Sequence, residues 1–168
     1  DTSAVKTQEL VINTDNNSGK KKKGSSSKGP TTITISSMGD CTLGTDESFD
    51  QSTSFNAYYN EYGADYFFKN VRSILEADDL SVVNFEGTLT EETSRADKTF
   101  AFKGPAKYTD ILTGSSVEAA NIANNHSKDY GTKSQEDTIK NLSNAGIATF
   151  GYENVVVVDV KGIKVGLT

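Results

Sequence analysis

The chain has very few of the residues that form covalent links or strong metal ligands. Its 168 residues include one cysteine, Cys41, and one histidine, His126. A single cysteine excludes a disulfide within one chain and any site built from several thiolates. No stretch approaches the roughly 18 consecutive apolar residues that span a membrane. The first residues also lack a charged start followed by an apolar run, so we expect no signal peptide within this sequence.

The sequence also lacks the motifs of several enzyme classes. It contains neither the G-x-S-x-G motif of serine hydrolases nor a phosphate-binding P-loop, and Cys41 has only the distant His126 as a base. The net charge is -6, which disfavours a general affinity for nucleic acid, so we expect no nucleic-acid partner. The hydrophobic fraction of 35% is low, but the deficit is concentrated in the first thirty residues. We therefore expect one folded domain over residues 31–168.

Residues 1–30 are expected to form a tether ahead of this domain. A short apolar run at residues 9–13 could pair as an edge strand, whereas residues 16–29 are Asn, Ser, Gly and Lys with almost nothing to bury. The lysines at 20–23 either contact an anionic surface, such as lipid headgroups or wall polymer, or belong to a solvated tether. This layout suits a protein held at a cell surface.

Beyond the tether, strand and helix patterns alternate, which is typical of an α/β fold. Strands are expected at 32–36, 80–89, 117–123 and 147–150, and a short strand followed by a turn over 100–105. A hairpin is expected at 154–159 and 163–167, and its valine run 155–158 is expected to be buried. A helix with its apolar stripe in the core is expected from Asp65, as N-cap, to Leu75. Two more are expected from Lys107 to Leu112 and over 132–145, the last ending at Gly146.

Polar residues follow three of these strands. Asp40, Glu86 and the pair Asn125–His126 each come where an apolar run ends, and carboxyl ends of parallel strands meet at one sheet edge. We expect these side chains to converge there, with Asp129 nearby to orient either the loop or His126. Carboxylate and amide oxygens can hold divalent cations that activate water, and a histidine can protonate a leaving group. Taken alone, Asp40 is equally consistent with an Asx-turn, and the Asn-Asn-His cluster with a capped turn.

Four motifs resemble those of the bacterial capsule-synthesis family called CapA, or poly-γ-glutamate biosynthesis proteins. They are GDCTLG at 39–44, NFEGTLT at 84–90, FKGP at 102–105 and ANNHSKDYG at 123–131. The resemblance covers residues 31–168. It implies a relationship to calcineurin-like metallophosphoesterases, in which Asp40, Glu86 and Asn125 would be metal ligands and His126 the catalytic acid. It further implies second-shell or substrate-binding roles for Asn84, Asn124, Asp129 and Lys103.

The resemblance also implies the architecture and setting of the protein. The chain would be the N-terminal half of a four-layer α/β/β/α sandwich, exposed at the extracellular face of the cell membrane after removal or omission of an upstream signal or anchor. Its partners would be the poly-γ-glutamate synthesis and export machinery, and an anionic polymer or the wall. Two positions depart from the parent superfamily: Thr42 stands where a histidine is usual, and Asn84-Phe85-Glu86 replaces a Gly-Asp motif.

These departures leave two hypotheses open. The protein is either a metal-dependent phosphoesterase or other hydrolase acting on a cell-envelope substrate, or a non-enzymatic component of polymer synthesis and export. Because the family resemblance places further histidines in a C-terminal half, we expect this chain to hold no transition metal tightly and to be inactive by itself, while Mg²⁺ or Ca²⁺ could bind weakly. Self-association or the missing half is expected to cover its terminal strands.

Overall fold

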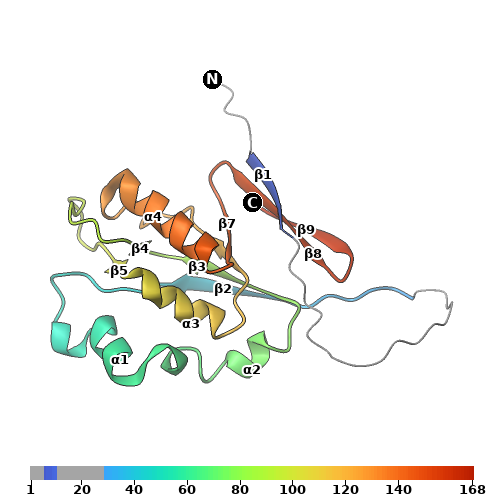
Figure 1. Ribbon diagram of the computed structural model, residues 1–168, viewed down its shortest axis with the longest axis horizontal. Helices are drawn as coiled ribbons and strands as arrows, with labels where there is room; N and C mark the ends of the chain where they lie inside the picture. Colours follow the sequence, from blue (N-terminus) through green and yellow to red (C-terminus); the bar gives the residue numbers. More distant parts are fainter. Residues whose placement is uncertain (1–5, 11–28) are drawn as a thin grey trace.

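The computed structural model describes residues 6–10 and 29–168, and two β-sheets organise this part of the chain (Figure 1). The first sheet has the order β2-β3-β6-β7, with all strands parallel: β2 (Ile35–Cys41), β3 (Leu80–Phe85), β6 (Ala119–Asn121) and β7 (Ala148–Phe150). The second has the order β1-β8-β9: β1 (Lys6–Leu10), β8 (Asn154–Val160) and β9 (Ile163–Leu167). A small pair joins β4 (Thr88–Leu89) to β5 (Lys103–Gly104). The expected α/β class with a parallel sheet is confirmed.

Helices cover one face of the first sheet, and the second sheet covers the other. The helices are α1 (Phe55–Tyr62), α2 (Arg72–Leu75), α3 (Thr109–Thr113) and α4 (Gly131–Asn144), with short 3-10 turns η1 (Gln51–Thr53), η2 (Ala64–Tyr66) and η3 (Ala106–Tyr108). Because strand side chains alternate between faces, Val83 and Phe85 pack with the helical residue Leu142, in one core cluster. Leu80 and Val82 belong to a second cluster with alternate valines of β8. The layers are therefore helix, sheet, sheet.

The helix α4 follows the sequence prediction closely. It spans Gly131–Asn144 against an expected 132–145, and Gly146 takes a positive φ of 83° just beyond its end. The Ile147 amide donates to the Leu142 carbonyl and the Gly146 amide to the Ser143 carbonyl, both at 3.0 Å. This is the Schellman arrangement that terminates a helix on glycine. The buried Leu142 then fixes the helix onto the first sheet.

The C-terminal hairpin also forms where the sequence indicates, although its valines are not all buried. β8 and β9 pair antiparallel through a turn in which Lys161 and Gly162 both have positive φ. Val156 and Val158 are buried at 1% and 0% exposure, whereas Val155 and Val157 are half-buried on the opposite face. The expectation of a fully buried run was wrong, because within the described residues only one face of this sheet is covered by another layer.

Two other elements differ from their predicted positions. The first strand of the domain runs over Ile35–Cys41 rather than 32–36, so Asp40 lies within β2, next to an irregularity in its pairing with β3 between Ser37 and Asp40. The helix expected from Asp65 to Leu75 is divided into η2 and the four-residue α2, and Asp65 does not cap it. With that helix interrupted, Leu75 is buried but Ile74 is 61% exposed.

Part of the predicted tether joins the fold. β1 (Lys6–Leu10) pairs in parallel with β8 at the edge of the second sheet, close to the strand expected at residues 9–13. Residues 1–5 and 11–28, with the lysines at 20–23, lie outside the described part of the chain, so the predicted tether stays a prediction there. Among the helices that the structure describes, none combines the length and the apolar character needed to cross a bilayer.

Candidate functional site

A chain of hydrogen-bonded side chains crosses the carboxyl edge of the first sheet. Asp40, Asn84 and Asn121 are register partners on β2, β3 and β6, so their side chains lie side by side. The Asn84 amide nitrogen donates to Asp40 Oδ1 at 2.7 Å, and the Asn121 amide nitrogen donates to Asn84 Oδ1 at 2.9 Å. The amides therefore point their donors toward Asp40, which fixes the orientation of that carboxylate.

The end of β7 closes this row of side chains. Gly151 has a φ of +108°, which L side chains rarely adopt, and a Cβ there would lie 2.4 Å from Asn121 Oδ1. Only glycine allows the backbone to pass this close to the Asn121 amide. Gly151 thus determines where the Asn121 side chain can lie.

The loop of residues 123–131 is tied to the same edge by Asn124. Its side-chain nitrogen donates to Asn84 Oδ1 at 3.1 Å and to the Phe85 carbonyl at 2.8 Å, while its Oδ1 accepts from the His126 amide at 3.0 Å. Asn125, the expected metal ligand, is exposed, and its backbone carbonyl accepts from Lys98 Nζ at 2.8 Å. The loop is therefore held by Asn124, and the side chain of Asn125 remains at the surface.

The ring of His126 is oriented by Asp129, as expected. Its Nδ1 lies 2.7 Å from Asp129 Oδ2, and the Asp129 side chain is fully buried. An ionised carboxylate only accepts hydrogen bonds, so Nδ1 carries the donated hydrogen. The other nitrogen, Nε2, lies 3.8 Å from Glu86 Oε1, and the ring packs against Phe102 with centroids 4.7 Å apart. His126 thus presents Nε2 to the carboxylate cluster.

Glu86 and Asp40 lie close enough to interact directly. Burial of Glu86, together with the nearby negative charge of Asp40, raises the pKa of Glu86, while His126 acts in the opposite direction. Within the described residues, neither carboxylate forms an ion pair with a lysine or arginine. Asp40, Glu86 and His126 therefore converge at one edge, where negative charge has no internal cation to neutralise it.

A segment without regular structure over residues 91–102, here called the strap, completes the site, and two buried aspartates anchor it. Asp46 accepts hydrogen bonds from the Ala101 amide at 2.6 Å and from Arg95 Nη2 at 2.9 Å. Asp129 accepts from the Phe102 amide at 2.6 Å and from Lys98 Nζ at 2.7 Å. Because carboxylates take up the amides of Ala101 and Phe102, the short strand expected within 100–105 forms only over Lys103–Gly104.

The lysine beside His126 is Lys98, which lies in the strap, and not the expected Lys103. Lys98 lies in a polar loop whose sequence gives no sign of a role in the site. Its Nζ is 3.3 Å from His126 Nδ1 and joins Asp129 to the Asn125 carbonyl. Lys103, the lysine expected near the site, donates to the Glu92 carbonyl at 2.7 Å and lies 4.5 Å from the centre of the Tyr130 ring. Its ammonium group is therefore engaged with the strap and with Tyr130.

Asp40, Glu86 and His126 could hold a divalent cation only in part, because they do not surround it. Two carboxylates and an imidazole nitrogen are ligands that hard or borderline cations accept. No group of three or more His, Cys, Asp or Glu side chains has the geometry to enclose a metal ion anywhere in the part of the chain that the structure describes. The uncompensated charge of Asp40 and Glu86 fits a cation, but further donors would be needed to enclose it.

Comparison with known proteins identifies the relatives of this chain. Residues 34–168 match the model of a family described as bacterial capsule synthesis protein PGA_cap. The chain is also 31% identical over 117 residues to the capsule biosynthesis protein CapA of Bacillus anthracis, an alignment that covers 63% of this chain and 28% of that protein. The alignment thus spans little more than a quarter of the curated relative, whereas the family match includes every strand of the first sheet. The chain belongs to the family of bacterial capsule synthesis proteins.

Proposed function

We propose that this chain is part of a cell-surface component of poly-γ-glutamate capsule synthesis or export, and that its carboxyl-edge cluster is a metallophosphoesterase-like hydrolytic centre. The observation that carries the proposal is the pairing of Asp40 with Glu86, two interacting carboxylates without an internal cation, beside a histidine that a buried aspartate orients. Membership of the capsule family supports the biological setting. The cell-surface location is part of the proposal.

The positions of Asp40, Glu86 and His126 support their proposed roles, and the family resemblance supports that of Asn125. Asp40, Glu86 and the exposed Asn125 would hold a divalent cation, which when bound lowers the pKa of water and neutralises charge on a phosphoryl-type oxygen. His126 would hold or deliver a proton at Nε2, the nitrogen that faces Glu86. Asp129 fixes the tautomer of His126 by accepting from Nδ1. Lys98 balances the buried charge of Asp129 and positions the loop through the Asn125 carbonyl.

The architecture fits the same proposal. A helical layer, a parallel sheet and a second sheet are the arrangement expected of three layers in an α/β/β/α sandwich, although the full four-layer fold is an inference. We propose that the fourth layer and the remaining metal donors come from other parts of the longer protein. The short span of the alignment relative to the Bacillus anthracis protein supports this view.

A second candidate function is a non-enzymatic one, in which the edge cluster binds a cation or polymer within the synthesis and export machinery. The observation that favours it is the absence of an enclosing ligand group among the described residues, together with a single histidine in the sequence. In this case His126 would shape the loop without transferring a proton. The two candidates therefore differ in what they require of the His126 ring.

The test uses the full-length protein, with metal content and capsule production measured for Asp40→Asn, Glu86→Gln and His126→Ala. The hydrolytic function predicts that both carboxylate variants lose metal, whereas His126→Ala keeps most of it and still loses capsule production. The accessory function predicts that His126→Ala supports capsule production. Asp97→Asn is the matched control, because Asp97 is exposed in the strap and forms no ion pair within the described residues. Normal metal content in both carboxylate variants would contradict the proposed site.

A further inference from the structure

A hollow of about 510 Å³ lies beside the candidate site, beyond the carboxyl end of β2. This volume falls within the roughly 300–1,000 Å³ typical of small-molecule sites. We call it the β2 hollow. Its lining includes Thr42, which follows Asp40 by two positions, and Phe102, whose ring packs against His126 with centroids 4.7 Å apart. Phe102 is therefore shared between the β2 hollow and the candidate site.

Phenylalanine rings form one side of the β2 hollow. Phe49 and Phe102 line it, and the Phe100 ring contacts both of them, with centroids 5.7 Å from Phe49 and 6.4 Å from Phe102. Phe49 is 41% exposed and Phe100 is 47% exposed, and none of the three rings belongs to either core cluster. The negative face of an aromatic ring attracts slightly positive C–H groups. These rings therefore offer an apolar platform to a ligand.

Threonine hydroxyls form a second part of the lining. Thr42, Thr45 and Thr53 line the β2 hollow, and their hydroxyls form no hydrogen bond with another residue in the described part of the chain. Thr45 is only 8% exposed, so the hollow is where its hydroxyl can find a partner. A nearly buried hydroxyl without a hydrogen bond is unfavourable. A ligand that carries hydroxyl groups would relieve this cost.

The charge of the lining indicates a neutral ligand. Among the described residues, no lysine, arginine or histidine lines the β2 hollow, and its charged side chain is Asp50. Asp50 Oδ1 accepts hydrogen bonds from the Ser52 amide at 2.9 Å and from the Ser52 hydroxyl at 2.7 Å. An anionic ligand would meet this carboxylate without a cation to balance it, in a chain of net charge -6. A quaternary ammonium would leave the threonine hydroxyls without partners.

We propose that the β2 hollow binds a neutral sugar ring. Such a ring has an apolar C–H face and several hydroxyl groups, which are the two features that the lining matches. The C–H face stacks on Phe49 and Phe102, and the hydroxyls exchange hydrogen bonds with Thr42, Thr45 and Thr53. Binding requires no cation at the carboxyl edge. The proposal therefore goes beyond the hydrolytic function and stands or falls separately.

The test titrates the ¹⁵N-labelled chain with three neutral disaccharides: maltose, cellobiose and N,N′-diacetylchitobiose. EDTA is present, so a divalent cation at the carboxyl edge cannot contribute to binding. At least one disaccharide should bind saturably and shift the backbone amides of residues 42–54 and 102. The uronic-acid form of that disaccharide, in which a carboxylate replaces one hydroxymethyl group, should bind about twofold to fivefold more weakly because of one partly exposed charge.

Two variants test the two parts of the lining. Thr45→Val removes the hydroxyl and keeps the shape of the side chain, while the backbone hydrogen bonds between residues 45 and 103 remain. It should weaken binding about twofold to tenfold, which is the effect of one lost neutral hydrogen bond. Phe49→Ala should weaken binding roughly tenfold because it removes part of the stacking surface. Phe49→Tyr retains an aromatic face and should bind as the unaltered chain does.

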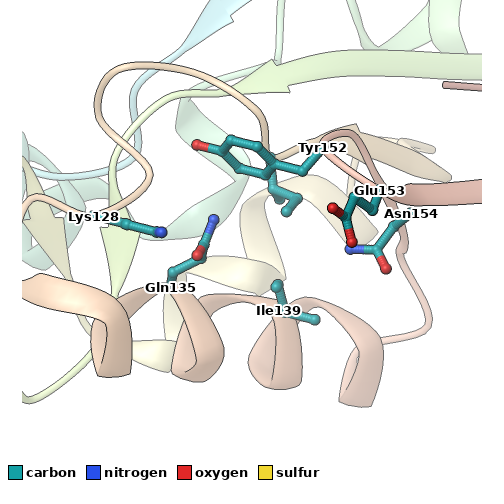
Figure 2. Close-up of a pocket in the computed structure, with 7 residues that line it drawn as sticks. Lys128, Gln135, Ile139, Tyr152, Glu153 and Asn154 are labelled. Carbon is teal, nitrogen blue, oxygen red and sulfur yellow. The ribbon is translucent and has the colours of Figure 1, made fainter. Parts of the chain in front are cut away.

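Tyr152→Ala is the matched control, because Tyr152 is an exposed aromatic residue that lines a different hollow, beside α4 (Figure 2). It should leave disaccharide binding unchanged, as should Thr93→Val, an exposed change in the strap. The proposal would be overturned if none of the three disaccharides binds saturably, or if the uronic-acid form binds as tightly as the neutral one. Binding that is unchanged in both Thr45→Val and Phe49→Ala, or that is lost in Tyr152→Ala, would also overturn it.

Discussion

The two carboxylates that anchor the strap differ sharply from the two at the carboxyl edge of the first sheet. Asp46 and Asp129 have fully buried side chains, and each accepts hydrogen bonds from a backbone amide and from a basic side chain. Asp40 is exposed, Glu86 is 16% exposed, and the two face each other with only the Asn84 amide and the more distant His126 nearby. The fold thus neutralises the carboxylates that hold it together and leaves the edge pair uncompensated.

This difference indicates which carboxylates stabilise the protein and which are kept for a ligand. Removing one partner from a buried, hydrogen-bonded charge pair is strongly destabilising because the remaining charge is left buried and unpaired. Removing one of two like charges held close together relieves repulsion instead. The strap carboxylates and the edge carboxylates should therefore respond in opposite ways to the same kind of substitution.

The largest effect is expected for Asp129→Ala. This change leaves Lys98, His126 and the Phe102 amide without their shared acceptor, and the expected loss is about 3–5 kcal/mol of unfolding free energy. For a chain of this size, that loss lowers the melting temperature by roughly 10 °C. Thermal unfolding followed by circular dichroism measures it. Asp97→Ala, an exposed change in the same strap, should have almost no effect, and equal stability of the two variants would contradict the anchoring role.

A smaller, pH-dependent effect is expected for Asp46→Asn. Burial alone would raise the pKa of Asp46, but hydrogen bonds from Ser48, the Ala101 amide and Arg95 outweigh it and lower the pKa. The ionised carboxylate therefore contributes stability above its unfolded pKa of about 3.9. This contribution disappears as the pH falls through the lower folded pKa.

Asp46→Asn should consequently melt several degrees below the unaltered chain at pH 7, with the difference narrowing between pH 4 and pH 2. Melting curves across that range test the prediction. Glu47→Gln is the control, because the Glu47 side chain is 70% exposed and lies 3.8 Å from Arg95 Nε. If the difference in melting temperature between Asp46→Asn and the unaltered chain stays constant with pH, the ionised carboxylate of Asp46 is not the source of the stability.

The smallest change in stability is expected for Glu86→Gln, and it should be a gain and not a loss. Because the pKa of Glu86 is raised, the folded chain holds this proton more tightly than the unfolded chain. Stability should therefore decrease as the pH rises from about 4.3 through the raised pKa. Without added metal at pH 7, Glu86→Gln should melt at the same temperature as the unaltered chain or a few degrees higher. Glu91→Gln, on the exposed part of the strap, should change nothing. A large loss of stability in Glu86→Gln would show that Glu86 stabilises the fold, as Asp46 and Asp129 do.

Features specified by local sequence were predictable, and features specified by distant contacts were not. α4 carries its own stop signal in Gly146, and the hairpin carries Lys161-Gly162, so both were located closely. The convergence of Asp40, Glu86 and His126 followed from the rule that parallel strands end at one edge.

The strap had no such local signal. Its polar residues show no periodicity, and its position depends on Asp46 and Asp129, which lie far from it in sequence. Lys98 could not be chosen over Lys103 without those contacts. The same holds for Asn124 and Asn125. Asn124 holds the loop because its side chain reaches the Phe85 carbonyl, and two adjacent asparagines give no sequence signal that tells which of them does so.

The central claim is that Asp40 and Glu86 are left uncompensated so that they can take up a cation. Melting of the 168-residue chain should be measured with increasing Mg²⁺ or Ca²⁺, beside the double variant Asp40→Asn/Glu86→Gln and the control Asp97→Asn. Once the ion exceeds its dissociation constant tenfold, binding adds about 1.4 kcal/mol of stability, or roughly 3–5 °C. We predict this rise for the unaltered chain and for Asp97→Asn, and none for the double variant. An equal rise in all three proteins, or no rise in the unaltered chain at any ion concentration, would contradict the claim.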